Sequence, residues 1–414
     1  MEKHKATNAE RKRSEKEALK LLRSARFFNE FLLAMKKAGL VGEELNALVL
    51  LIVAVSRVLN RPLNLFVKGH SSAGKNWLVT RLLRLMPKGA VAEITSASDK
   101  AWNYLESDYR HCVVYLQERN ESAGTIDPIR TLISEGKLIR IVPGFENGKR
   151  VTKKYVARGP VAAISTTTKN YLQIDDETRH ISIWVDESED QTRQIVKSYA
   201  NKKTPLSRSD QRTWHMVHRM LEKRVGVRIA VPQWFEQVAE RLFVGDLRVR
   251  RYYPAFVEAC RTVCLIRSFQ RNRKRHKHCR LEVDFADFAI TTLIFDPVFV
   301  ESLHLDKGAG EATRRIVDEI ATRKKRPVDA NDIAKKLQIS MDQAYGKLRY
   351  AAKTGVIHQS NKPQKSNRKA YLPTPQPRFV PDPEKLFQEL SEVKGPLRFV
   401  HPITGKSVTY ERED

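Results

Sequence analysis

The sequence predicts an α/β core made of a parallel sheet with helices on both faces, followed by an all-helical region and a C-terminal winged helix. Three observations lead to this prediction. A glycine-rich loop joins an apolar strand pattern to a helical pattern at residues 69–76. Several other short apolar runs end in polar side chains, as buried strands of an open α/β sheet do. Close to the C-terminus, three helical patterns precede two strand patterns and a basic loop.

The glycine-rich loop has the sequence GHSSAGKN and lies between an apolar run, residues 63–67, and a helical pattern, residues 77–85. Its two glycines allow a tight turn that directs backbone amides at an anion, and Lys75 begins the helix, where the dipole favours anions. This is the P-loop pattern G-x-x-x-x-G-K, except that Asn76 replaces the Ser or Thr that binds magnesium. The alternative is a chance glycine turn before a helix. The predicted phosphate-binding residues are Gly69, Ser71, Ser72, Ala73, Gly74, Lys75 and Asn76.

Composition restricts the class of protein. With 414 residues, 30% of them charged and 41% hydrophobic, the chain is expected to form several globular domains. Its net charge of +27 indicates a polyanionic partner, most simply nucleic acid. No apolar run approaches the ~18 residues of a membrane span. The N-terminus lacks an apolar signal region and the cysteines form no CxxC pair, so we expect a cytoplasmic protein with free thiols and no membrane association.

Helices are expected on both sides of the P-loop strand. Residues 1–40 form an N-terminal helical region, in which a solvated helix is followed by a helix with apolar spacing. The α/β core is assigned to residues 41–203 and begins with an apolar helix at 43–59 that should pack beside the sheet. After the P-loop helix we expect a strand at 90–94 and a helix at 99–109.

A second buried strand, residues 112–116, ends in Gln117 and Glu118. In P-loop ATPases an Asp at the carboxyl end of such a strand holds magnesium, and a following Glu polarises the attacking water. Here Gln117 stands at the position of the Asp, while Glu118 stands at the position of the catalytic Glu. The alternative is a buried strand whose exit is merely polar.

Two further strands carry candidate residues at their ends. A buried strand at 161–164 leads into hydroxyls at 165–168, which can sense a γ-phosphate or orient water, unless this is an ordinary strand terminus. Arg179 lies among acids immediately before a strand at 181–185. It is either part of a structural salt bridge or an arginine finger that stabilises transferred charge in a neighbour's site.

A basic hairpin is expected between these strands. Residues 138–142 and 149–156 are rich in β-formers and are joined by a turn at 143–148 that contains Asn-Gly. The cations either form a solvated face or follow a phosphate backbone. They are Lys149, Arg150, Lys153 and Lys154.

The order of these motifs resembles that of AAA+ ATPases and, within these, minichromosome-maintenance-type helicases of the compact kind carried by phages, plasmids and chromosomal cassettes. The stretches GHSSAGKN, VVYLQE, LISEGKL, GPVAAISTTTKN and DDETRHISIWVDESEDQTRQ, within residues 60–195, carry the resemblance. It implies that the P-loop binds ATP with Mg²⁺, that Glu118 is the catalytic base, and that a threonine of 166–168, of which we choose Thr167, is the first sensor. Arg179 would act on the neighbouring subunit of a hexameric homo-oligomeric ring, and the hairpin would grip single-stranded DNA.

The magnesium side of the site departs from the family pattern. Asn76 and Gln117 can each offer the ion only a neutral amide oxygen, directly or through water. Slow hydrolysis is therefore left open.

Residues 204–306 are expected to form an entirely helical lid. By the resemblance, Arg250, at the start of one lid helix, reaches back to the γ-phosphate as a second sensor, with Arg251 as the competing candidate. A solvent-facing arginine is the alternative. A later basic turn either contacts nucleic acid or is a solvated loop. Its central cations are Arg273, Lys274 and Arg275.

Residues 307–373 predict a winged helix-turn-helix domain, a type of domain that also ends minichromosome-maintenance-type helicases. Gln343 and Lys347 lie one turn apart on its second turn helix, and would face duplex DNA unless this domain contacts protein. Residues 374–414 form a proline-rich arm and a tail, to which the sequence assigns no function beyond a possible contact with a neighbouring subunit.

These predictions together describe an ATP-driven DNA translocase or helicase that acts as a ring in the replication of a mobile genetic element. The alternative is an ATP-gated DNA-binding or helicase-loading factor with weak hydrolysis, which Asn76 and Gln117 favour. A transcriptional regulator led by the winged helix is a third, weaker hypothesis.

Overall fold

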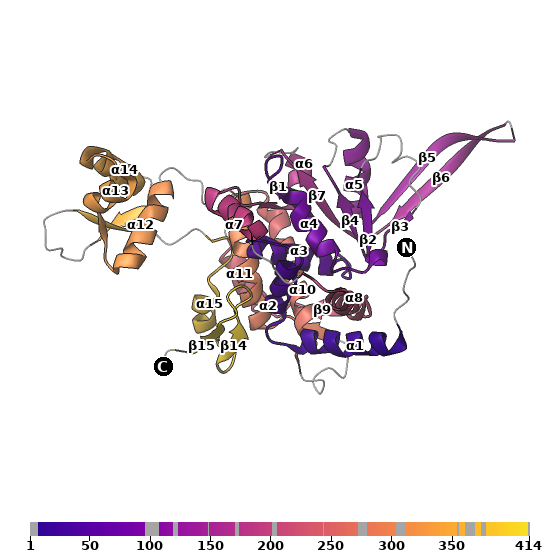
Figure 1. Cartoon of the computed structure of the whole chain (residues 1–414). Helices are drawn as coiled ribbons and strands as arrows, with labels where there is room; N and C mark the ends of the chain where they lie inside the picture. The colour runs from indigo at the N-terminus through magenta and orange to yellow at the C-terminus, as the bar shows by residue number, and fades with distance from the viewer. Residues whose placement is uncertain are drawn as a thin grey trace. The chain divides into compact units, whose positions relative to one another are not determined.

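The chain divides into two compact units, Met1–Val298 with Val380–Asp414, and Phe299–Phe379 (Figure 1). Each unit is considered by itself. The computed structural model describes residues 7–95, 107–118, 123–147, 149–169, 174–200, 205–242, 244–271, 280–303, 311–353, 356–360, 369–373 and 378–412.

The larger unit is built on a five-stranded parallel sheet with the order β2-β4-β7-β1-β8. Every residue of β1 and β7 is buried, as expected for central strands covered on both faces. Because β7 lies between β1 and β4, the carboxyl ends of these three strands meet at one edge. The five strands confirm the predicted ones, and their bounds are β1 Leu65–Lys68, β2 Val91–Ile94, β4 Cys112–Leu116, β7 Val161–Thr167 and β8 Ile181–Trp184.

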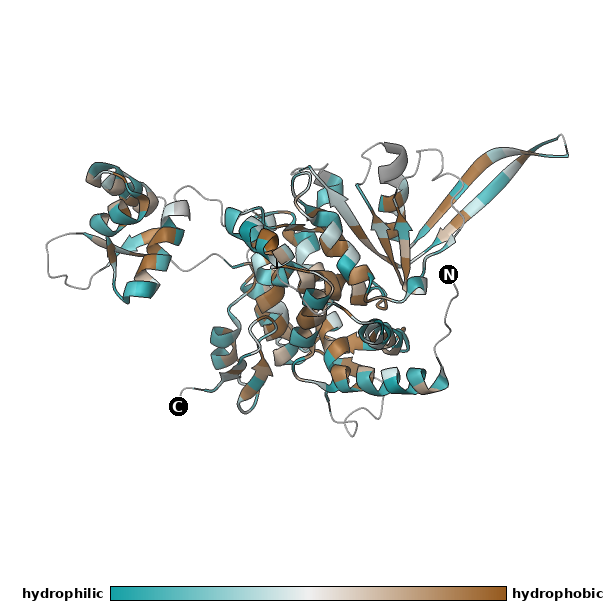
Figure 2. Cartoon of the chain, in the orientation of Figure 1, coloured by the Kyte–Doolittle hydropathy of each residue, from teal (hydrophilic) through white to brown (hydrophobic). Residues whose placement is uncertain are grey.

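Helices pack against this sheet and against one another. The helix α3 is buried at every position from Ala47 to Ser56, because it contacts both α4 and α10 and therefore has no solvated face. The N-terminal helices rest on α8, where Phe27 and Phe31 pack around Trp214. Figure 2 shows the hydrophobic colour concentrated among these inner helices. The bounds are α1 Asn8–Arg23, α2 Phe27–Lys37, α3 Glu44–Ser56, α4 Lys75–Leu83, α5 Ala123–Glu135, α6 Ile174–Glu177, α8 Arg208–Glu222, α9 Phe235–Glu240, α10 Val249–Arg267 and α11 Phe285–Ser302.

Three local predictions were wrong. The end of the core region, for which no helix was predicted, contains α7 (Glu189–Ala200), whose only buried residue is the polar Gln191, while its apolar residues Ile195, Val196 and Tyr199 are exposed. The helix expected at 99–109 ends instead in a short strand, β3 (Ser107–Asp108), while residues 96–106 lie outside the described residues. The region expected to be entirely helical contains two strands that pair in parallel, β9 (Arg228–Ala230) and β10 (Arg280–Glu282).

The predicted hairpin is present and longer than expected. Strands β5 (Lys137–Glu146) and β6 (Lys149–Arg158) pair antiparallel along their whole length, because Pro143 and Gly144 continue the ladder instead of turning. At its base, Leu138 packs in an apolar cluster with core residues of β4 and α5. The rest extends away from the sheet as a two-stranded ribbon (Figure 1).

The smaller unit contains three helices around a three-stranded sheet of order β11-β13-β12. Its core joins residues of all three helices and all three strands, including Val317, Ile333 and Leu348. Asp329 caps α13 through a reciprocal capping box with Asp332. These elements lie where the sequence predicts them, at α12 Glu311–Lys324, β11 Val328–Asp329, α13 Ala330–Leu337, α14 Met341–Lys353, β12 Ile357–Gln359 and β13 Ala370–Pro373.

The C-terminal tail returns to the larger unit, as α15 (Pro383–Glu389) and the hairpin of β14 (Leu397–Val400) and β15 (Ser407–Tyr410). Its Phe387 packs against Phe285, and Asn29 of α2 donates hydrogen bonds to three carbonyls of the hairpin turn. The described part of the tail thus finds its partners on its own chain, where the sequence had left a neighbouring subunit open. In the described ranges, no helix is long and apolar enough to cross a membrane.

Candidate nucleotide-binding site

The loop between β1 and α4 has the backbone geometry of a phosphate cradle. Gly69 has φ 151° and Gly74 has φ 93°, backbone conformations that residues other than glycine rarely adopt. A Cβ at Gly69 would also meet Val185 Cγ2 at 2.5 Å and Glu187 Oε1 at 2.8 Å. Glu187 accepts the backbone N–H of His70 at 2.6 Å and so holds the start of the loop.

Lys75 begins α4 and is 6% exposed. Its Nζ donates to the carbonyls of Gly69 at 2.8 Å and His70 at 2.6 Å, so the ammonium lies over the loop. Burial lowers its pKa, while the nearby carboxylates of Glu118 and Glu187 oppose that shift. A phosphate bound in the loop would favour the charged amine in the same way.

The end of β4 faces the end of β7. The backbone N–H of Glu118 donates to Thr166 Oγ1 at 3.0 Å, and Glu118 has φ 46°, a strained conformation that such a contact helps to hold. Thr167 Oγ1 instead accepts the N–H of Lys169 at 3.1 Å. The structure therefore places Thr166, not the predicted Thr167, beside Glu118, because successive strand residues point to opposite faces.

Asn76, the second residue of α4, is joined to β4 by a contact that the sequence did not indicate. The hydroxyl of Tyr115 donates to Asn76 Oδ1 at 3.1 Å. Tyr115 is 1% exposed, and burial raises the pKa of its hydroxyl to about 12. The phenol is therefore protonated at neutral pH and available as a donor.

A cavity of about 390 Å³ adjoins the P-loop. It lies between the loop residues Ser72–Gly74, the α2–α3 connection and α7. Trp77 and Tyr199 line it and are 50% and 83% exposed. Its volume suits a small ligand, and its aromatic walls suit a planar ring.

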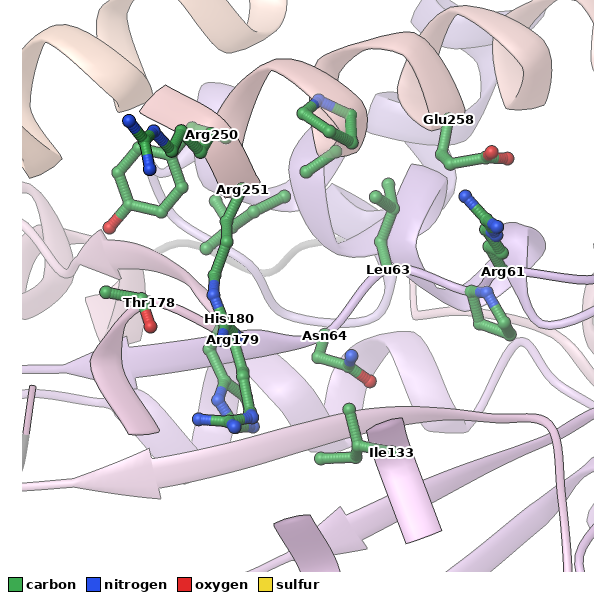
Figure 3. Close-up of a pocket in the computed structure, with 15 residues that line it drawn as sticks. Arg61, Leu63, Asn64, Ile133, Thr178, Arg179, His180, Arg250, Arg251 and Glu258 are labelled. Atoms are coloured by element: carbon green, nitrogen blue, oxygen red, sulfur yellow. The ribbon is translucent and has the colours of Figure 1, made fainter. Parts of the chain in front are cut away.

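A second cavity, of about 280 Å³, lies at the other edge of the sheet (Figure 3). It is lined by Asn64, just before β1, and by Arg179, shortly before β8, so it opens at the amino ends of the strands. The four residues of β1 separate it from the P-loop by roughly 13 Å. Arg250 and Arg251 from α10 line the same cavity.

Arg179 is held within its own chain by neutral acceptors. Its guanidinium donates to Ser134 Oγ at 3.2 Å and to the Asp175 carbonyl. Burial lowers its pKa, and the neighbouring cations Arg251 and Arg130 lower it further.

The placement of Arg250 corrects one prediction. A side chain that shares the cavity of Arg179, on the far side of the sheet, does not fit contact with the phosphates of its own P-loop. Arg250 groups with Arg179 and Arg251 instead.

The predicted DNA-binding residues lie in three places. The register of the hairpin puts Arg150 and Lys154 on one face and Lys149 and Lys153 on the other. On α14 of the smaller unit, Lys347 is exposed, whereas the Gln343 side chain accepts the N–H of Ser340 and caps the helix. The predicted cluster Arg273, Lys274 and Arg275 lies outside the described residues.

A comparison with known families supports the P-loop. Residues 12–140 match the family described as the MTBMA_p00010 P-loop domain. A crystal structure described as a full-length MCM homolog from Methanopyrus kandleri aligns with 73% of this chain at 10% identity and a TM-score of 0.42. The alignment covers 63% of that protein, which is less than two thirds of its length. No curated protein matches the chain.

The chain thus contains a P-loop domain, which implies nucleotide binding, typically with Mg²⁺, and suggests hydrolysis of a nucleoside triphosphate. The donors present do not fit a magnesium ion ligated by the protein in the usual way. Asn76 and Gln117 are neutral, and the oxygen of Asn76 already accepts a hydrogen bond from Tyr115. Among the described residues, no group of three or more His, Cys, Asp or Glu side chains could hold a metal ion.

Sequence reasoning missed several residues of this site. Tyr115 carried no signal, because an aromatic residue in a buried strand is ordinarily core. Tyr199 belongs to a helix that was not predicted. Glu187 is separated from the P-loop by 117 positions, and only the parallel pairing of β1 with β8 brings the two together.

Proposed function

We propose that this protein is an AAA+-type ATPase of the minichromosome-maintenance kind, which assembles as a ring and moves along or unwinds DNA. The observation that carries the proposal is the division of charged groups between two edges of one sheet. Lys75 and Glu118 lie at the carboxyl edge, and Arg179, Arg250 and Arg251 lie at the amino edge.

The amino edge supports a site completed by a second copy. Four arginines, Arg61, Arg179, Arg250 and Arg251, line one small cavity together with Glu258, and within the described ranges Arg179, Arg250 and Arg251 form no ion pair with a carboxylate. Such a cluster is stabilised by an anion. In a head-to-tail ring, the triphosphate on the neighbour's P-loop is the anion that would meet it, with Arg179 as the finger.

The hairpin supports a nucleic-acid substrate. Across β5 and β6, Arg150 lies opposite Phe145 and Lys154 lies opposite Ile141, so these four side chains share a face. Phe145 is 68% exposed and Ile141 is 67% exposed. A face that combines cations with an exposed aromatic ring suits single-stranded DNA, through phosphate contact and base stacking. The opposite face places Glu146 across from Lys149, which weakens its attraction for phosphate.

The helices α8 to α11 would be the lid in this proposal, and the smaller unit a winged helix. Its helix α14 presents Lys347 and the exposed Tyr350, the latter 55% exposed, for contact with duplex DNA. The cavity beside Trp77 would receive the base of ATP.

The second candidate function is an ATP-gated DNA-binding or helicase-loading factor with weak hydrolysis. It is favoured by Asn76 and Gln117, which leave the metal side of the site without a charged ligand. It shares the nucleotide site and the DNA-binding face with the first.

Hydrolysis of ATP with and without single-stranded DNA tests the proposal and separates these functions. We expect measurable hydrolysis that DNA stimulates, and a loss of about 100-fold or more in Glu118→Gln, because a positioned base contributes that much. Negligible hydrolysis that is unchanged in Glu118→Gln would leave only the gated factor.

Charge-removal pairs on the hairpin identify the DNA-binding face. Arg150→Ala with Lys154→Ala should abolish the stimulation and reduce the salt dependence of DNA binding by a log–log slope of about 1.4, since each lost phosphate contact removes about 0.7. Lys149→Ala with Lys153→Ala should reduce stimulation less. The exposed α1 pair Lys12→Ala with Arg13→Ala removes the same charge elsewhere and should retain it.

A further inference from the structure

Two hydrogen bonds beneath the P-loop link the end of β4 to β7 and to α4. The backbone N–H of Glu118 donates to Thr166 Oγ1 at 3.0 Å, and the hydroxyl of Tyr115 donates to Asn76 Oδ1 at 3.1 Å. The Thr166 hydroxyl lies close enough to Tyr115 to counteract the rise in the pKa of the phenol that burial causes. Both of these residues are buried, at 0% and 1% exposure, so water does not compete for their hydroxyls.

The protons of these hydrogen bonds can be placed one by one. Thr166 uses a lone pair to accept from the Glu118 amide, and its hydroxyl lowers the pKa of the neighbouring Tyr115, opposing the effect of burial. Tyr115 then has its single proton for Asn76. The atom of Asn76 that faces the tyrosine is therefore the amide oxygen, and its N–H₂ group points away from Tyr115.

The N–H₂ group lies where a P-loop ordinarily presents a hydroxyl oxygen. Asn76 follows Lys75 at the start of α4, and that position faces the β- and γ-phosphates and their metal ion. An amide nitrogen has no lone pair for a metal ion, but it donates well to an anionic oxygen. Gln117, in the place of the usual Asp, adds no charge that would attract the cation.

We infer that Asn76, oriented by Tyr115, binds the nucleotide phosphates through its amide N–H₂ group, so that this P-loop holds nucleotide without a protein-ligated Mg²⁺. Tyr115 is then a positioning residue, and any magnesium ion is carried by the phosphates and water alone. The inference rests on the proposed nucleotide site and specifies how that site contacts its ligand.

The test is the affinity of the full-length protein for ADP and ATP, measured by calorimetry in excess MgCl₂ and in excess EDTA. For the natural chain we expect the two Kd values to agree within about threefold, because no protein–metal bond is lost in EDTA. Asn76→Thr restores a ligating hydroxyl and should bind about tenfold or more tightly with Mg²⁺ than without it. Tyr115→Phe releases the amide, so binding in EDTA should weaken by about threefold to tenfold and become Mg²⁺-dependent.

A matched control is Tyr253→Phe, which also removes one hydrogen bond from a partly buried tyrosine, to the Phe235 carbonyl, away from the P-loop. It should keep the natural ratio of Kd values. The inference is overturned if the natural chain binds nucleotide at least tenfold more tightly in MgCl₂ than in EDTA, a difference of about 1.4 kcal/mol in binding free energy. It is also overturned if folded Tyr115→Phe keeps the natural affinity in EDTA. Absence of nucleotide binding in both buffers would instead reject the nucleotide site itself.

Discussion

The two edges of the central sheet differ in how completely the chain satisfies their charged groups. At the carboxyl edge, Lys75 is folded onto two loop carbonyls and Glu118 is fixed by Thr166. At the amino edge, Arg179 donates only to neutral acceptors, and its charged neighbours are two other arginines and the carboxylates of Asp175 and Asp176. The first edge is organised by the chain for a ligand, whereas the arginines of the second are only partly balanced by these carboxylates of the chain.

This difference separates two roles that one site ordinarily combines. A preorganised cradle binds nucleotide by itself, because its amides and its ammonium are already directed at the phosphates. A finger acts only on charge that develops during transfer, so it contributes to hydrolysis and little to ground-state binding. The edges should therefore respond differently to substitution.

The largest effect is expected for a pair of variants, one from each edge. Lys75→Ala should weaken nucleotide binding by about 100-fold, since buried charge-assisted hydrogen bonds are lost. Arg179→Ala should keep binding within about threefold and lower DNA-stimulated hydrolysis by about 1,000-fold, as for other arginine fingers. Calorimetric titration and a steady-state phosphate assay measure the two quantities.

Equal losses of binding in both variants would contradict the comparison, because Arg179 would then belong to the same cradle as Lys75. Arg84→Ala is a suitable control, since this exposed arginine lies at the end of α4, away from both cavities. It should leave both binding and hydrolysis unchanged.

The smallest effect concerns stability at the amino edge. Burial and, after it, repulsion from Arg251 lower the pKa of Arg179, so we expect the cluster to be tolerated and not stabilising in the isolated chain. Arg251→Ala should change the melting temperature by no more than about 2 °C, as surface substitutions do. It should nevertheless reduce hydrolysis in the assembled protein. A large drop in melting temperature would show that Arg251 has a structural role.

The sequence predicted the core of this fold because its signals are local. A glycine loop between a strand and a helix, and apolar runs such as Cys112–Leu116, each carry their own pattern. The helix α7 had no such pattern, since its one buried residue is polar. Strands β9 and β10 were missed because each has only three residues, which is too few to show the alternating apolar pattern of a strand.

Only those residues of the site that belong to a sequence motif could be predicted. Lys75 and Glu118 belong to patterns, whereas Tyr115 became visible only when the sheet placed it beside Asn76, and the grouping of Arg251 with Arg179 only when α10 placed them at one cavity. The sequence also does not say which face of β7 meets Glu118, so it could not show that Thr166, and not Thr167, lies beside that residue.

The central claim, that each active site is shared between two copies, is tested most directly by mixing two inactive variants. Lys75→Ala supplies an intact Arg179, and Arg179→Ala supplies an intact P-loop. In a head-to-tail ring formed from equal amounts, about one interface in four combines both intact parts, so about a quarter of the natural hydrolysis should return. Mixtures no more active than either variant alone would contradict the account, because the two edges would then not meet across an interface.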